Sequence, residues 1–204
     1  MGETTFEAVG NPTDVAFFKF LQDNEIPIHL NIQEKLANVL ATVPFSSSAK
    51  FMATAVKTRD FQGEEIVTLY VKGAPEVVVK MCNSKLYNGE NAQLNKNEHN
   101  EILGIVKTLA QQPLRVITFA FLQMDMVSWK NNFERGGNSA SEALQSWLFK
   151  NSSSLCYIGT FGLKDDLRPK IASVINFARG EGGNNMGVKL VSGDHIETAK
   201  RIAE

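Results

Sequence analysis

Two runs of residues that favour β-strands, 50-KFMATAV-56 and 66-IVTLYVK-72, constrain the fold of this chain more than any other feature. β-Branched and aromatic residues, which pack well on a pleated sheet, recur in both runs. The segment between them, 58-TRDFQGEE-65, has the composition of a turn. Two such runs joined by a short turn predict an antiparallel hairpin.

The second run ends at a junction that combines a cation with a permissive backbone. Lys72 closes the strand, Gly73 follows it, and Pro75 and Glu76 suit the start of a short helix over 75–82. Glycine lets a ligand approach the backbone, and lysine offers a compact charge for a phosphate. The same residues also suit a strand-to-helix turn that binds nothing, so both interpretations stay open here.

Other elements are predicted on both sides of the hairpin. A helix over 11–24 is favoured because Asn11 and Pro12 open it and Asp14 lies in its first turn. The remaining expectations are a helix over 97–112, a strand over 114–122, a loop over 83–95 and a mobile excursion over 130–141. Segment 33–45 fits either a helix that runs into a strand or a strand throughout.

The pattern changes near residue 155. A strand is predicted over 155–163, a helix over 168–180, a strand over 188–194 and a helix over 195–204. Such a β-α-β-α series implies parallel strands with right-handed crossovers. The expected fold is therefore α+β, with an antiparallel sheet and flanking helices in a first domain (1–155). A fragment of a parallel α/β sheet (156–204) follows it.

Composition excludes several function classes. The formal net charge is −1, so no global basic field attracts nucleic acid, and an anion site must be local. No run approaches the roughly 18 apolar residues expected of a membrane span. Cys82 and Cys156 lie far apart without metal-binding spacing, which favours reduced, structural thiols.

A set of motifs in one order gives the strongest functional signal. The motifs are 10-GNPTDVA-16, 44-PFSSSAKFM-52, 71-VKGAPE-76, 114-LRVITFAF-121, 162-GLKDDLRP-169 and 191-VSGDH-195. Together they resemble the P-type ATPases, the ATP-driven cation pumps, from inside the nucleotide-binding domain into the phosphorylation domain. The resemblance covers nearly the whole chain and is closest to the type II pumps, the calcium pumps especially.

The resemblance implies an ATP site in the first domain. Phe45 matches the aromatic residue that stacks on adenine, and Asp14 takes the place of the acidic residue near the adenine edge. Lys50 and Lys72 match the two pocket lysines, and Gly73 lines the wall beside Lys72. Arg115 matches the arginine that reaches toward the phosphates. Ser47 stands where several relatives carry a phosphate-facing arginine, which implies fewer phosphate contacts.

The resemblance also implies a phosphate and magnesium region in the second part of the chain. Ser192, Gly193 and Asp194 stand where the family has Thr-Gly-Asp, and Asp194 matches the aspartate near the transferred phosphate and Mg²⁺. Asp165 and Arg168 match the Asp and Arg of a DPxRP-like element, in which Asp166 replaces the usual proline.

The DKTGT sequence that accepts the phosphoryl group in these pumps does not occur in the chain. We therefore expect ATP binding without turnover, in a fragment from the cytosolic face of a membrane pump. Its partners are expected to be the transmembrane, actuator and remaining phosphorylation domains. Two alternatives are an interaction scaffold that has lost its ligand and a soluble phosphohydrolase of the haloacid dehalogenase type, for which no DxDxT-like nucleophile is found.

Overall fold

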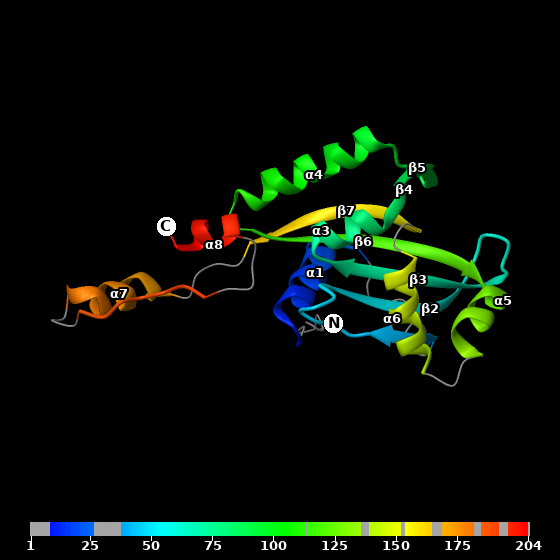
Figure 1. The fold of residues 1–204 in the computed structure, drawn as a ribbon, viewed down its shortest axis with the longest axis horizontal. Helices are drawn as coiled ribbons and strands as arrows, with labels where there is room; N and C mark the ends of the chain where they lie inside the picture. Colours follow the sequence, from blue (N-terminus) through cyan, green and yellow to red (C-terminus); the bar gives the residue numbers. More distant parts are fainter. Residues whose placement is uncertain are drawn as a thin grey trace, which may run out of the picture. The chain divides into compact units, whose positions relative to one another are not determined.

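The structure is a computed structural model that describes residues 9–26, 38–112, 114–135, 139–151, 154–164, 169–181, 185–191 and 196–203. Within these residues, seven strands form one sheet in the order β1-β2-β3-β6-β7-β4-β5 (Figure 1). The strands are β1 (Val39–Val43), β2 (Phe51–Arg59), β3 (Glu65–Gly73), β4 (Cys82–Tyr87), β5 (Glu90–Gln93), β6 (Leu114–Asp125) and β7 (Leu155–Lys164). The chain divides into two compact units, Met1–Leu94 with Thr118–Gly159 and Asn95–Ile117 with Thr160–Glu204, and each is described by itself.

The predicted hairpin is confirmed as β2 and β3, which pair antiparallel from Phe51↔Gly73 to Arg59↔Glu65. The Asp60 side chain stabilises the connecting turn, because its Oδ1 accepts hydrogen bonds of 2.9 Å from the amides of Gln62 and Glu64. The junction that follows is a short helix, α3 (Pro75–Val78), extended by a 3₁₀ turn, η1 (Val79–Met81). The hairpin and the short helix after it both agree with the elements predicted from the sequence.

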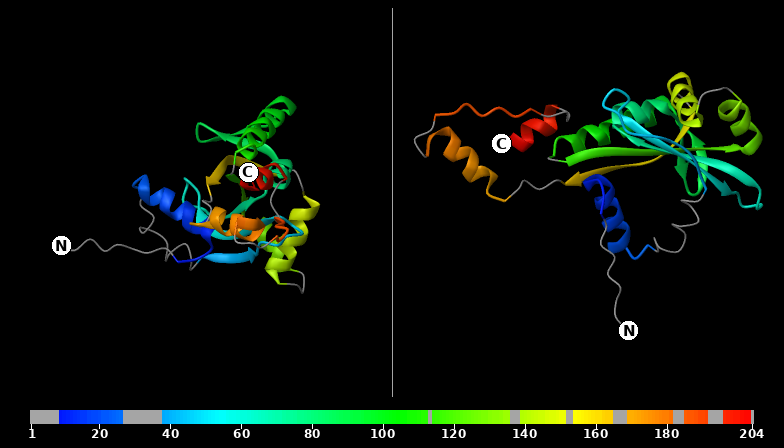
Figure 2. Two further views of the ribbon diagram at one scale, coloured as in Figure 1. Left: turned by 90° about the vertical axis from the view of Figure 1, so that its left-hand side faces the viewer. Right: turned by 90° about the horizontal axis from the view of Figure 1, so that it is seen from below.

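One face of the sheet carries the core of the first unit. Alternate side chains of β2 and β3 point to this face, and α6 (Ala140–Lys150) packs on it. The fully buried members of the cluster include Phe51, Val67, Leu69, Val71, Trp129, Phe133, Leu144 and Leu148. Helix α1 (Pro12–Asp23) lies on the opposite side of the sheet from α6 (Figure 2).

Helix α1 begins where the sequence predicts. Asn11 is the N-cap, and its Oδ1 accepts a 3.0 Å hydrogen bond from the amide of Thr13, while Pro12 occupies the first turn. One turn further on, the Phe17 ring meets the Phe119 ring edge-on, with centroids 4.9 Å apart. This contact packs α1 against strand β6.

The expected loop over 83–95 is wrong, because β4 and β5 form a second hairpin there. Asn88 and Gly89 both have positive φ (50° and 84°), as a two-residue hairpin turn requires. Strand β4 also pairs in parallel with β7, through Cys82↔Leu155 and Lys85↔Tyr157. The sheet is consequently mixed, which corrects the predicted antiparallel sheet.

The expected mobile excursion over 130–141 is wrong for the residues described there. Helix α5 (Met126–Trp129) continues as a π-helical turn, η2 (Lys130–Glu134), and α6 begins at Ala140. The ring of Phe133 is buried next to Trp129 and Trp147, with centroids 4.5 and 5.8 Å away. Burial of these aromatic rings orders a segment whose polar residues alone favour a loop.

The second unit contains α4 (Lys96–Ala110), which starts with a capping box formed by Asn95 and Glu98. It also contains α7 (Ile171–Asn176), a π-helical turn η3 (Phe177–Glu181) and α8 (Ile196–Ala203). These helices agree with the predictions, but residues 185–191 form no strand, so the predicted strand over 188–194 is wrong where it is described. The parallel, dehalogenase-like segment is therefore not confirmed, and the boundary near residue 155 stays a prediction.

Candidate functional site

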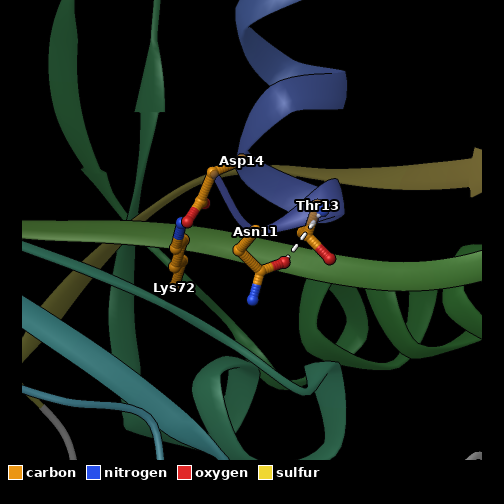
Figure 3. A network of polar contacts seen from close by, with 4 residues as sticks. All are labelled: Asn11, Thr13, Asp14 and Lys72. Atoms are coloured by element: carbon orange, nitrogen blue, oxygen red, sulfur yellow. Dashed lines mark hydrogen bonds and ion pairs between the residues drawn. The ribbon is translucent and has the colours of Figure 1, made fainter. Parts of the chain in front are cut away.

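An ion pair joins the first helix to the hairpin. Asp14, in the first turn of α1, accepts a hydrogen bond through Oδ1 from Nζ of Lys72 on β3 (Figure 3). The cap at Asn11 fixes the helix start, and Asp14 lies in the first turn that follows it. The Asp14 side chain is 51% exposed and that of Lys72 is 24% exposed, so the pair lies at the edge of the sheet surface within reach of a ligand.

A second ion pair lies at the start of β2. Nζ of Lys50 is 3.1 Å from Oε1 of Glu76, the second residue of α3, and both side chains are about half exposed. Lys50 has a positive φ of 58°, which few non-glycine residues adopt. Two hydrogen bonds hold this backbone, because the Lys50 amide donates to the Ser46 carbonyl (2.8 Å) and the Lys50 carbonyl accepts from Ala74 (2.9 Å).

Gly73 is buried between the strands at this point. A Cβ atom on Gly73 would lie 2.4 Å from the Lys50 carbonyl oxygen and 2.7 Å from Cα of Phe51. Real Cβ atoms essentially never come this close to backbone, so only glycine fits. The close approach of Lys50 therefore accounts for this glycine by itself, and a role in lining a nucleotide pocket stays a prediction.

Phe45 lies on the loop that leads to Lys50, and its ring is 61% exposed. The loop is held by local hydrogen bonds, including one of 3.1 Å from the Ala49 amide to Oγ of Ser46. Large aromatic side chains usually gain by burial, so an exposed ring on an ordered loop is suited to stack on a flat ligand. Phe45 is therefore not a core residue, whereas its contact with adenine stays a prediction.

The structure brings Lys50 and Lys72 to the same end of the hairpin. Lys72 is the register partner of Met52, two residues after Lys50, and the pair Phe51↔Gly73 lies between them. With Asp14 and Phe45, these side chains come from α1, the loop before β2 and the end of β3. This end of the hairpin thus carries two ammonium groups, each paired with a carboxylate, and the loop that leads to it carries an exposed ring.

The other predicted site residues belong to the second unit or lie outside the described residues. Arg115 is exposed on the first residues of β6, which belong to the second unit. Asp165, Arg168, Ser192, Gly193 and Asp194 lie outside the described residues. Sequence reasoning missed Glu76 as the partner of Lys50, because a glutamate in a first helical turn is already explained by the helix dipole.

The described residues contain no group of three or more His, Cys, Asp or Glu side chains that could hold a metal ion. The two lysines, the exposed ring and the neighbouring serines are residue types that suit the phosphates and base of a nucleotide. Both cysteines are buried free thiols, as predicted, and burial raises the pKa of Cys82 to about 12. They are therefore poor nucleophiles at neutral pH.

Comparison with known proteins identifies the family of this chain. The family profile described as "P-type ATPase, cytoplasmic domain N" matches residues 1–170, so the chain belongs to the P-type ATPase family. Calcium-transporting ATPase 2 of Saccharomyces cerevisiae is 30% identical over 173 residues, 82% of this chain and 14% of that protein. Sodium/potassium-transporting ATPase subunit alpha-4 of Rattus norvegicus is 27% identical over 195 residues (96% and 17%). Plasma membrane calcium-transporting ATPase 1 of Gallus gallus is 29% identical over 208 residues (96% and 15%).

The chain spans only about one sixth of the length of these relatives. Among the helices in the described part of the chain, none is long and apolar enough to cross a bilayer. The match therefore establishes the family and the domain of this chain, and it does not by itself establish the activity of a whole pump.

Proposed function

We propose that this domain binds ATP at the end of the β2–β3 hairpin and presents its phosphates to other parts of a cation pump. The observation that carries the proposal is that Lys50 and Lys72 lie at the same end of the hairpin, with the exposed Phe45 five residues before Lys50 in the chain. An aromatic ring can stack on adenine, which is worth about 0.5–1.5 kcal/mol beyond the buried area. Each ammonium–phosphate hydrogen bond adds roughly 1.5–3 kcal/mol.

In the proposed arrangement, the Phe45 ring stacks on the base, and the ammonium groups of Lys72 and Lys50 lie on the phosphate side of the nucleotide. Arg115 is proposed to reach the phosphates as well. Asp165, Arg168, Ser192, Gly193 and Asp194 are proposed to belong to the phosphoryl-transfer region, where Asp194 would help hold Mg²⁺. The metal would neutralise charge on the transferring phosphate when it is bound.

The proposal extends to the parent protein in a coarser form. The relatives named above are calcium-transporting and sodium/potassium-transporting ATPases. We propose that the chain serves a pump of this kind, on the cytosolic face of its membrane, with calcium as the favoured cargo. For the printed chain by itself we propose nucleotide binding without hydrolysis, because its sequence contains no DKTGT aspartate.

An ATP titration followed by backbone amide NMR shifts tests the proposal on the wild-type chain, Lys72→Ala and Lys57→Ala. Lys57 is a matched control, because it also forms an ion pair, with Glu65 at 2.7 Å, but at the other end of the hairpin. We expect saturable binding without Mg²⁺, about tenfold weaker in Lys72→Ala and unchanged in Lys57→Ala. No binding by the wild-type chain at several millimolar ATP would favour the interaction scaffold instead.

A further inference from the structure

Both lysines of the candidate site are already paired with carboxylates. Lys72 is held by Asp14 and Lys50 by Glu76, so the two pairs together have no net charge. A phosphate that approaches Lys50 therefore meets an ammonium group whose charge is balanced by a carboxylate 3.1 Å away.

The backbone position of Glu76 is fixed by the fold. Pro75 starts α3, the Ala74 amide is hydrogen-bonded to the Lys50 carbonyl, and Gly73 permits that close approach. The Lys50 backbone and the Glu76 backbone are consequently tied together at a short distance. The Glu76 carboxylate therefore starts from a backbone position within reach of the Lys50 ammonium group, where the two form their ion pair.

We propose that Glu76 determines how strongly the site discriminates between phosphorylated and unphosphorylated ligands, by acting as the counter-ion of Lys50 that a phosphate must displace or share. The inference rests on the proposed function. Two anions next to a single ammonium group repel one another, so Glu76 weakens the binding of phosphate and has little effect on the nucleoside portion. Without the charge of Glu76, the phosphates contribute more to the affinity than they do with it.

The substitution Glu76→Gln tests this role, because glutamine keeps the size and the acceptor oxygen and removes the charge. Dissociation constants for ATP, AMP and adenosine are measured by NMR titration on the wild-type chain and on Glu76→Gln. We expect ATP and AMP to bind two- to fivefold more tightly to the variant, equivalent to about 0.4–1 kcal/mol at 1.4 kcal/mol per tenfold change. Adenosine is expected to show no such gain, and added salt should reduce the gain for ATP.

Glu65→Gln is the matched control, because Glu65 forms a similar half-exposed ion pair with Lys57 on the same two strands. It should leave the affinity for ATP unchanged. The double variant Lys50→Met/Glu76→Gln should bind ATP no more tightly than Lys50→Met alone, because the effect of Glu76 acts through Lys50. Thermal unfolding of each variant verifies that the fold is kept.

Several results would overturn the inference. They are weaker ATP binding by Glu76→Gln, an equal gain for adenosine, an equal gain in Glu65→Gln, or a gain that persists without Lys50. In each of these cases the wild-type chain still binds ATP, so the proposed function survives. If the wild-type chain binds neither ATP nor adenosine, the proposed function fails and this inference fails with it.

Discussion

The substitution Gly73→Ala tests the most crowded point of the structure. The new methyl group would lie 2.4 Å from the Lys50 carbonyl oxygen and 2.8 Å from Cβ of Phe51, and the nearest atoms are backbone that cannot rotate away. Overpacking of this kind costs about 1–3 kcal/mol. Separation of the strands would also weaken the hydrogen bond from Ala74 to Lys50, worth about 1 kcal/mol.

Alanine also lowers the conformational entropy of the unfolded chain, which raises the free energy of unfolding by about 0.4–1 kcal/mol. The expected net loss in the free energy of unfolding is therefore about 1–3 kcal/mol. Urea unfolding followed by tryptophan fluorescence measures it, because Trp129 is buried in the same compact unit as Gly73. With a denaturant slope near 2 kcal/mol per molar, the midpoint should fall by about 1 M.

Gly10→Ala is the control for this experiment, since a Cβ atom there would meet nothing within 4 Å. Its midpoint should stay close to that of the wild-type chain. A midpoint for Gly73→Ala that matches the control would refute the close approach of Lys50 to β3. The explanation of the glycine by packing would then fail.

Three further predictions concern the core, the acid range and the thiols. Leu148→Ala should lower the free energy of unfolding by about 2–5 kcal/mol in urea, because Leu148 is completely buried in the core cluster. Hydrogen bonds from the Ser128 hydroxyl (2.6 Å) and amide (2.8 Å) lower the pKa of Asp125 below its ordinary value of 3.8. The stabilisation by these hydrogen bonds is therefore present above that pH and is lost as the pH falls below it. Acid should for this reason destabilise the wild-type chain more than Asp125→Asn, as unfolding measured between about pH 6 and pH 3 would show. Cys82 and Cys156 should react slowly with an aromatic disulfide reagent at about pH 8 in the folded chain and rapidly in urea, because burial raises the pKa of both thiols; rapid reaction of the folded chain would contradict their burial.

Local signals explain most of what could be predicted from the sequence. The cap at Asn11, the hairpin β2–β3 and the start of α3 at Pro75 each depend on residues close together in the chain. The β4–β5 hairpin was equally accessible, since Asn88-Gly89 is a strong turn signal that the polar composition of its surroundings obscured. Helix α6 was accessible too, through the capping box of Ser139 and Glu142.

The remaining features depend on contacts between distant residues. The ion pair of Asp14 with Lys72 joins positions 58 residues apart, and no local pattern indicates such a partner. Residues 188–191 have the apolar composition of a strand, yet composition cannot supply a neighbouring strand for hydrogen bonding, and the described chain offers none there. The sequence therefore indicates Lys50 and Lys72 as candidate site residues. It does not indicate that each lysine forms an ion pair with a carboxylate.

The parallel pairing of β4 with β7 has a consequence for synthesis on the ribosome. Cys82 and Leu155 are register partners that lie about 70 residues apart, and contacts of such long separation form late and slowly. At roughly 5–20 residues per second, the β4–β5 hairpin waits about 4–14 s for its neighbour to be synthesised. During that interval the edge of β4 that β7 will cover is open to other strands. A nascent chain stalled before Leu155 should for this reason be more prone to aggregation than the finished domain.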